Sequence, residues 1–125
     1  MTNKFLPVLC LPLLLAGCAT SITNLTPMQQ VRNANNLYPV EIAMGSSQQT
    51  VRWESIRPQI LVGNDAYPMR ATLLMTNRWE GLVPVPAGSK SVTYRYKVDY
   101  ECNSFGKAKT TSQLTREYLL RIVSQ

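Results

Sequence analysis

The sequence predicts an all-β fold, a small antiparallel β-sandwich of about six to seven strands. The clearest sign lies at residues 92–102, where apolar and polar side chains alternate without a break. Such alternation puts one face of a strand against a core and the other in water. Short apolar runs elsewhere are separated by turn clusters such as Gly63-Asn64-Asp65, and no segment carries a sustained helical stripe. Several short strands with turn signals between them are typical of a sandwich.

The individual strands follow from the same two signals. One alternation begins at Val40 and stops at Gly45. Pro84 and Pro86 mark a strand end, because proline has no backbone N–H to donate to a neighbouring strand. Residues 103–112 contain Gly, Lys and Thr and predict a loop. The expected strands are 40–44, 51–54, 59–62, 67–75, 79–85, 92–102 and 118–123, with a helix over 112–123 as the alternative for the last one.

The N-terminus has the pattern of an exported protein. A single cation, Lys4, precedes an apolar run from Phe5 to Ala16, which is the pattern of a secretory signal peptide. The run is too short to cross a bilayer as a helix, which needs about 20 apolar residues. It ends in Leu15-Ala16-Gly17-Cys18, which resembles the lipobox of bacterial lipoproteins.

This resemblance implies processing, an anchor and a location. Residues 1–17 would be removed as a lipoprotein signal peptide, and the Cys18 thiol would carry a diacylglyceryl group. This covalent lipid would be the only attached group, because the sequence predicts no cofactor. Two or three acyl chains hold a protein stably at a membrane. Ala19 replaces the aspartate that usually retains such lipoproteins at the inner membrane, so the outer membrane is expected, on its periplasmic or its surface side.

The mature chain is expected to consist of a tether and a domain. Residues 18–36 are rich in Thr, Ser, Asn and Gln and predict a lipidated cysteine followed by a flexible tether. Residues 37–125 carry the strand signals and predict the β-sandwich domain. Its pattern is similar to that of immunoglobulin-like and transthyretin-like domains, without the paired cysteines of antibody domains. With Cys18 acylated, we expect no disulfide within the mature chain and a small core side chain at Cys102.

The composition argues against catalysis and metal binding. The chain contains no His, the commonest general base near neutral pH and the commonest metal ligand. Its glycines are isolated and its serines show no nucleophile elbow. We therefore expect neither an enzyme nor a metal site. Lys and Arg number 13 against 7 Asp and Glu, a formal net charge of +6, but no nucleic-acid motif accompanies this charge.

Two copies of one tripeptide, Arg52-Trp53-Glu54 and Arg78-Trp79-Glu80, provide candidate interaction residues. On a strand the Trp points one way while the Arg and the Glu point the other. An exposed Trp beside Arg would form a docking face, because both residue types are enriched in interface hot spots. The alternative is a pair of core tryptophans flanked by solvated ion pairs.

Arg95 and Lys97 are further candidates, because cations crowd the last third of the chain. A basic surface of this kind suits anionic lipid headgroups, lipopolysaccharide or an acidic partner protein. The alternative is an ordinary solvated strand face.

These observations favour a non-catalytic lipoprotein that serves as a structural or accessory subunit in the cell envelope. It would bind another envelope protein through its sandwich, for instance by pairing an extended segment with an open sheet edge. It could also form oligomers. The alternative is a lipoprotein that binds a glycan, lipopolysaccharide or another small envelope ligand through exposed aromatic and basic residues.

Overall fold

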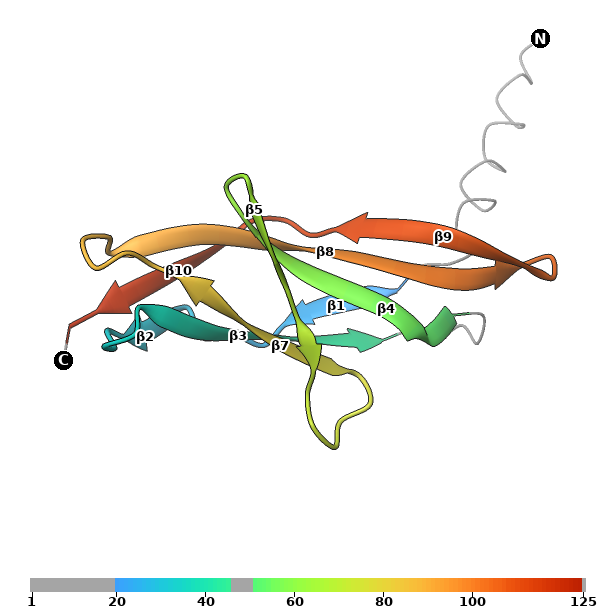
Figure 1. Ribbon diagram of the computed structural model, residues 1–125, viewed down its shortest axis with the longest axis horizontal. Coiled ribbons are helices and arrows are strands. Elements are labelled where there is room, and N and C mark those ends of the chain that lie inside the picture. Colours follow the sequence, from blue (N-terminus) through green and yellow to red (C-terminus); the bar gives the residue numbers. More distant parts are fainter. Residues whose placement is uncertain (1–19, 46–50, 125) are drawn as a thin grey trace, which may run out of the picture.

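The computed structural model describes residues 20–45 and 51–124, except for the side chain of Ser104. Within these ranges the chain forms ten strands, and no helix long and apolar enough to cross a membrane is present. The strands are arranged as two layers (Figure 1). They are β1 (Ser21–Asn24), β2 (Gln29–Val31), β3 (Leu37–Gly45), β4 (Val51–Val62), β5 (Asp65–Pro68), β6 (Arg70–Ala71), β7 (Arg78–Pro84), β8 (Ser91–Ser104), β9 (Lys107–Leu114) and β10 (Tyr118–Val123).

The all-β sandwich predicted from the sequence is confirmed. One layer, the β3 sheet, has the strand order β1-β3-β7-β6. The other layer, the β8 sheet, has the order β2-β10-β8-β4-β5, and β9 pairs with β8 beside this path. Every pairing is antiparallel except that of β2 with β10, which is parallel. The described residues thus contain more strands than the six to seven expected.

A single apolar core lies between the two sheets. In β8, alternate side chains from Tyr94 to Cys102 are at most 2% exposed, so the predicted alternation is confirmed. The rings of Tyr94, Tyr96 and Tyr118 pack with centroids 5.5 to 5.8 Å apart, a separation favoured by aromatic pairs. The other sheet and the flanking strands complete the core with Tyr38, Val40, Ile42, Met44, Val51, Ile56, Ile60, Trp79, Val83, Val85, Leu120 and Ile122.

β4 passes through a proline, so the two short strands expected at 51–54 and 59–62 are parts of one long strand. The carbonyl of Pro58 accepts a hydrogen bond from the N–H of Met69 at 3.1 Å, on the side of β4 away from β8. The N–H that proline lacks is therefore not needed by the ladder between β4 and β8.

The segment expected as a tether belongs to the sandwich. β1 pairs with β3 and β2 pairs with β10, so the prediction of a flexible linker is wrong for residues 20–36. This stretch contains few large apolar residues, so the sequence did not indicate strands here. Much of its attachment to the sandwich comes from polar side chains. The Arg32 guanidinium, for example, donates hydrogen bonds to carbonyl oxygens of the turn between β7 and β8, at Val85, Pro86 and Ser89.

Three other expectations differ from the structure. Residues 103–112 are not a loop, because β8 and β9 form a hairpin whose turn is Phe105-Gly106, both with positive φ (52° and 80°). The helix considered for 112–123 is contradicted, because residues 118–123 form β10. The strand expected at 67–75 is limited to β5 and β6, which are followed by a loop.

Cys102 is a fully buried core residue, as expected. Its sulfur is disulfide-bonded. The absence of a disulfide in a mature chain acylated at Cys18 stays a prediction.

Candidate functional site

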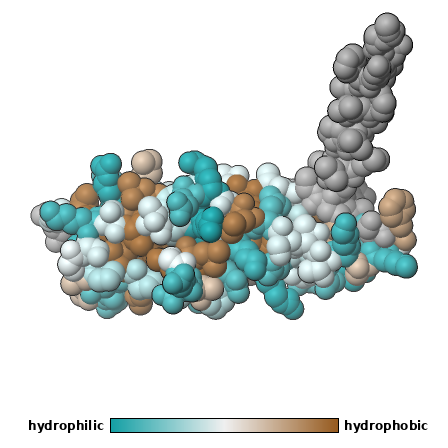
Figure 2. All heavy atoms as spheres, turned by 90° about the horizontal axis from the view of Figure 1, so that it is seen from above, coloured by the Kyte–Doolittle hydropathy of each residue, from teal (hydrophilic) through white to brown (hydrophobic). Residues whose placement is uncertain are grey.

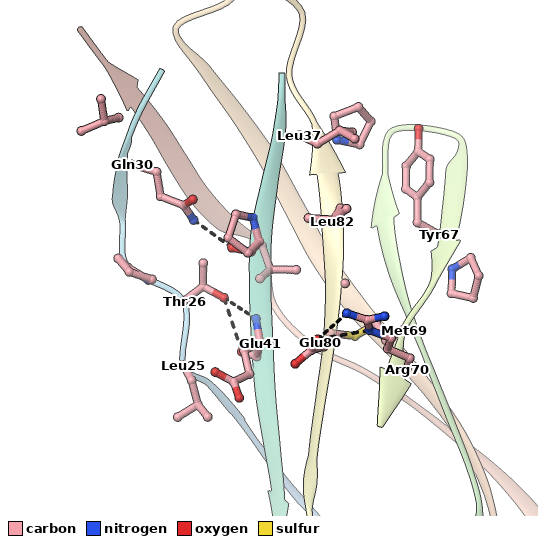
Figure 3. A pocket seen from close by; sticks show the side chains of 17 residues that line it. Leu25, Thr26, Gln30, Leu37, Glu41, Tyr67, Met69, Arg70, Glu80 and Leu82 are labelled. Atoms are coloured by element: carbon pink, nitrogen blue, oxygen red, sulfur yellow. Dashed lines mark hydrogen bonds and ion pairs between the residues drawn. The ribbon is translucent and has the colours of Figure 1, made fainter. Parts of the chain in front are cut away.

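A groove of about 1350 Å³ lies on the outer face of the β3 sheet. Its floor consists of outward-pointing side chains of β3 and β7, among them Leu37 and Leu82 (Figure 3). Both are apolar and about half exposed at positions that face solvent on an alternating strand. The groove is lined by Leu25, Thr26, Pro27, Gln30, Val31, Leu37, Pro39, Val40, Glu41, Tyr67, Pro68, Met69, Arg70, Glu80, Gly81, Leu82 and Pro84.

One wall of the groove is the segment between β1 and β2, which runs along the edge of β3. The Leu25 N–H donates to the Glu41 carbonyl at 2.9 Å, and the Thr26 hydroxyl accepts the Glu41 N–H at 2.9 Å. Gln30 Nε2 donates to the carbonyl of Pro39 at 2.9 Å (Figure 3). Pro39 has no N–H, so it leaves no donor unsatisfied here. Side chains thus occupy this edge of β3, and it offers little for pairing with another strand.

The opposite wall is the segment that crosses from the β8 sheet to the β3 sheet, residues 67–70. Gly81 of β7 lets this segment approach closely. A Cβ atom at Gly81 would lie 2.7 Å from Cδ1 of Ile60 and 3.3 Å from Cγ of Met69. The groove therefore has two built walls, and its shape depends on a glycine in its floor strand.

Charged side chains border the groove at one end. Arg70 donates to Glu80 Oε2 from Nε at 3.1 Å and from a terminal nitrogen at 2.9 Å. Glu41 lies 4.0 Å from the guanidinium of Arg78. Arg70 is mostly exposed and the other three side chains are 35% to 41% exposed, and solvent-accessible pairs of this kind contribute about 0 to 1 kcal/mol. These pairs balance the charge beside the apolar floor and add little to stability.

The two matching tripeptides have opposite environments. Trp79 is 7% exposed and packs in the core, whereas Trp53 is 39% exposed. The pairing of β4 with β8 shifts its register at a β-bulge between Arg52 and Arg57. Val51 before the bulge and Ile56 within it face the core, whereas Trp53 points outward.

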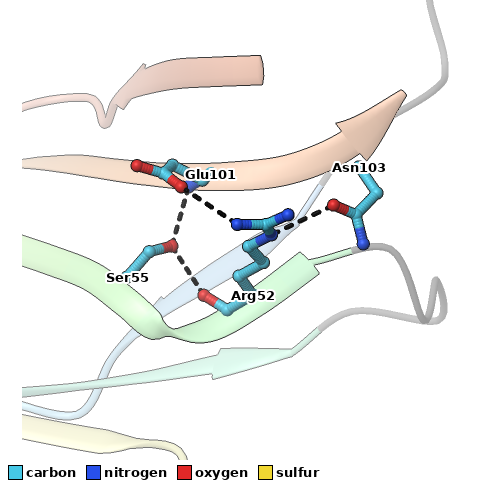
Figure 4. Close-up of polar contacts among 4 residues, drawn as sticks. All are labelled: Arg52, Ser55, Glu101 and Asn103. Carbon is cyan, nitrogen blue, oxygen red and sulfur yellow. Dashed lines mark hydrogen bonds and ion pairs between the residues drawn. The ribbon is translucent and has the colours of Figure 1, made fainter. Parts of the chain in front are cut away.

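Ser55 stabilises this bulge (Figure 4). Its hydroxyl donates to the Arg52 carbonyl at 2.6 Å and accepts the N–H of Glu101 at 2.8 Å. The Arg52 side chain donates to Asn103 Oδ1 at 3.0 Å and lies 3.6 Å from the Glu101 carboxylate. The predicted residues Arg52 and Trp53 are thus adjacent to a bulge on β4 and lie outside the groove.

The structure does not bring the six predicted site residues together. Arg95 and Lys97 lie at half-buried outward positions of β8, on the sheet opposite the groove. Figure 2 views the side of the molecule on which β8, β9 and β5 lie in Figure 1, and apolar atoms there form patches between polar ones. Of the predicted residues, Arg78 forms an ion pair with a groove residue, Glu41.

Sequence reasoning missed the groove residues. The available signal was an apolar side chain at an outward strand position, as at Leu37 and Leu82. The walls could not be anticipated, because residues 25–31 were assigned to a tether and residues 67–70 to a continuous strand.

Among residues 20–45 and 51–124, no cluster of three or more metal-ligating side chains is found. Comparison of the chain with protein-family models, curated proteins and solved structures finds no match.

Proposed function

We propose that this chain is an outer-membrane lipoprotein, acylated at Cys18, that acts as a non-catalytic accessory subunit and binds another envelope protein in the groove. The anchor is supported by the lipobox-like sequence Leu15-Ala16-Gly17-Cys18 after a short apolar run. The binding role is supported by the groove on the outer face of the β3 sheet.

The size and lining of the groove favour a protein segment over a small molecule. Sites for drug-sized ligands measure about 300–1,000 Å³, and this groove measures about 1350 Å³. Its floor presents exposed apolar side chains from neighbouring strands, such as Leu37 and Leu82. An exposed apolar surface between raised walls is typical of a protein-docking groove.

The occupant that fits best is an amphipathic helix. The floor is a sheet face, whose backbone N–H and C=O groups are used in the ladder between β3 and β7. A bound segment must therefore satisfy its own backbone hydrogen bonds, which a helix does. The edge of β3 beside the groove is occupied by Thr26 and Gln30, which argues against strand addition there.

The alternative of a glycan or small envelope ligand has less support. It requires aromatic side chains at the surface as stacking platforms, but the exposed Trp53 and Phe105 lie outside the groove. Four tyrosines are at most 2% exposed: Tyr38, Tyr94, Tyr96 and Tyr100. No cluster of exposed aromatic rings lines the groove, where Tyr67 is the one aromatic residue.

Site-specific crosslinking in intact cells tests the groove. A photoreactive amino acid at Leu82 should crosslink to a peptide of another envelope protein with apolar residues at helical spacing. The matched control is Leu114 on β9, which is also apolar and equally exposed (52% against 50%) but lies outside the groove. Leu82→Asp should reduce the affinity for that partner at least about tenfold, as expected for loss of a central apolar contact, and Leu114→Asp should not.

Equal crosslinking from the two positions would overturn the groove as the docking site. A crosslink from Leu82 to a second copy of this chain, or to lipid or glycan alone, would also overturn the proposed partner.

A further inference from the structure

The fold begins very close to the proposed acylated cysteine. Thr20 already belongs to the sandwich, since its hydroxyl donates to Gln113 Oε1 at 2.6 Å and its carbonyl accepts Gln113 Nε2 at 2.9 Å. Only Ala19 lies between Cys18 and Thr20, and each of the two steps along the chain spans at most about 3.6 Å. If Cys18 is acylated, as proposed above, the end of the sandwich at Thr20 must lie at the membrane surface.

Two loops that start near this end carry the most exposed apolar residues: the turn of the hairpin of β8 and β9 lies at the tip of the molecule, and the loop before β7 projects below its middle (Figure 1). Leu73, Leu74 and Phe105 are 85%, 97% and 103% exposed, the highest values among the large apolar side chains of the described residues. Leu73 and Leu74 lie in the loop before β7, and Phe105 is at the turn of the hairpin of β8 and β9.

The strand pairings place the bases of both loops near the start of β1. Ser21 pairs with Gly45, the last residue of β3, and the neighbouring Met44 N–H donates to the carbonyl of Asn77 at the end of the first loop. β4 begins at Val51, six positions after Gly45, and Val51 pairs with Cys102, three positions before Phe105 in the hairpin turn.

Both loops also hold an apolar residue in the left-handed backbone region. Leu74 has φ 65° and Phe105 has φ 52°, where L-residues other than glycine and asparagine are disfavoured. Two bulky apolar residues are thus presented to solvent in unfavourable backbone conformations, which points to a function outside the folded chain.

We propose that this end of the sandwich, which we name the basal end, rests on the bilayer that holds the acyl chains, with Phe105 and Leu73–Leu74 inserted at the headgroup boundary. The exposed Lys107 and Lys109 beside Phe105 favour anionic headgroups. Two other charged groups lie nearby: the Arg52 guanidinium forms an ion pair with Glu101, and the Glu54 carboxylate is exposed and adds one negative charge. Trp53 also lies near this end, and Trp is a residue type enriched at membrane interfaces.

Quenching of added tryptophans by brominated lipid tests this inference. The acylated full chain is reconstituted in vesicles of phosphatidylcholine with one-quarter phosphatidylglycerol, with Trp53→Phe as background and buried Trp79 as a constant signal. Brominated acyl chains should remove about half of the added emission of Phe105→Trp and of Leu74→Trp, because these side chains would lie within the boundary region.

The matched control is Ala87→Trp in the exposed turn before β8. This turn lies at the end of the fourteen-residue strand opposite to Phe105, about 45 Å from the hairpin turn. Its emission should be unchanged.

Quenching at position 87 equal to that at 105 and 74, or no quenching at 105 and 74 in vesicle-bound protein, would overturn the basal-end proposal alone. Wild-type protein that does not sediment with the vesicles would overturn the acyl anchor and this inference with it.

Discussion

The hydroxyl of Tyr96 in β8 donates a hydrogen bond to Asn24 Oδ1 in β1 at 2.7 Å, across the interior between the two sheets. The same amide donates from Nδ2 to the hydroxyl of Tyr94 at 3.0 Å, and Asn24 Oδ1 also accepts the N–H of Thr26. The Asn24 side chain therefore provides a hydrogen-bond partner for the hydroxyl groups of two buried tyrosines. This contact joins the strand nearest the N-terminus to the centre of the fold.

Replacing Asn24 by Ala should lower the free energy of unfolding by about 1–3 kcal/mol, because the Tyr94 and Tyr96 hydroxyls would lose their shared partner. Urea unfolding measures the change. Asn35→Ala, at an exposed position in the turn before β3, is the control and should change stability by less than about 0.5 kcal/mol. Equal effects of the two substitutions would contradict the role given to Asn24.

Stability should fall in alkaline solution because of Tyr96. Burial, offset in part by the hydrogen bond to Thr26, raises the pKa of the Tyr96 phenol above its usual value of about 10. Above that pH the unfolded chain releases this proton and the folded chain keeps it. Unfolding is thereby favoured by up to about 1.4 kcal/mol per pH unit.

Urea unfolding between pH 8 and pH 11 should therefore give a steeper decline for the wild type than for Tyr96→Phe. The Phe variant retains the ring and has no ionisable group at this position. Parallel declines would show that another group controls the alkaline limit. Tyr96→Asp should not fold, since it would place an unpaired charge in the core.

The bulge in β4 should depend on Ser55. Removing its hydroxyl in Ser55→Ala leaves the Glu101 N–H and the Arg52 carbonyl without this bridge, at a cost of about 1 kcal/mol for a half-buried pair. The bulge should also loosen, so that iodide quenches Trp53 emission more strongly. Ser91→Ala, at the exposed first residue of β8, is the matched control. An unchanged midpoint and unchanged quenching in Ser55→Ala would mean that the bulge is stabilised by other contacts.

The chemistry of Cys18 and that of Cys102 constrain each other. A Cys18 sulfur that carries a diacylglyceryl group cannot also form a disulfide, so acylation and a Cys18–Cys102 bond exclude each other. We expect the envelope-isolated protein to have the mass of residues 18–125, which is 125 − 17 = 108 residues, plus its acyl groups. Cys18→Ser should abolish the added mass and release the protein from the membrane. A protein that carries no acyl groups, and whose mass is that of the reduced chain minus two hydrogen atoms because a disulfide has formed, would contradict the anchor.

The sequence predicted the fold class because the strongest signal, the alternation at 92–102, comes from a strand with one face fully buried. It failed at β9, whose residues are mostly exposed and polar, so that no apolar period marks them. It also failed at β1 and β2, where hydrogen bonds from Asn24, Thr26 and Arg32 supply much of the attachment. Short-range patterns do not report such long-range polar contacts.

The candidate site was harder to predict than the fold, because its residues come together only through the sheet topology. Leu82 lies next to Pro39 by strand pairing, and 43 positions separate them in the sequence. The repeated Arg-Trp-Glu motif was a misleading guide, since β4 advances five positions from Arg52 to Arg57 while β8 advances two from Glu101 to Asp99, and this shift reverses which way Trp53 points. A local pattern cannot reveal a bulge whose stabilising partner, Glu101, is 46 residues from Ser55.

The parallel pairing of β2 with β10 has a consequence for biogenesis. Val31 is matched with Val123, so an early segment of the chain completes its hydrogen bonding only when a segment 92 residues later is available. A polypeptide threaded through a translocon amino end first would deliver these two partners at the beginning and near the close of its passage. Such long-range pairing delays assembly, so an exported chain with this topology would stay extended through most of its passage and acquire its final form afterwards.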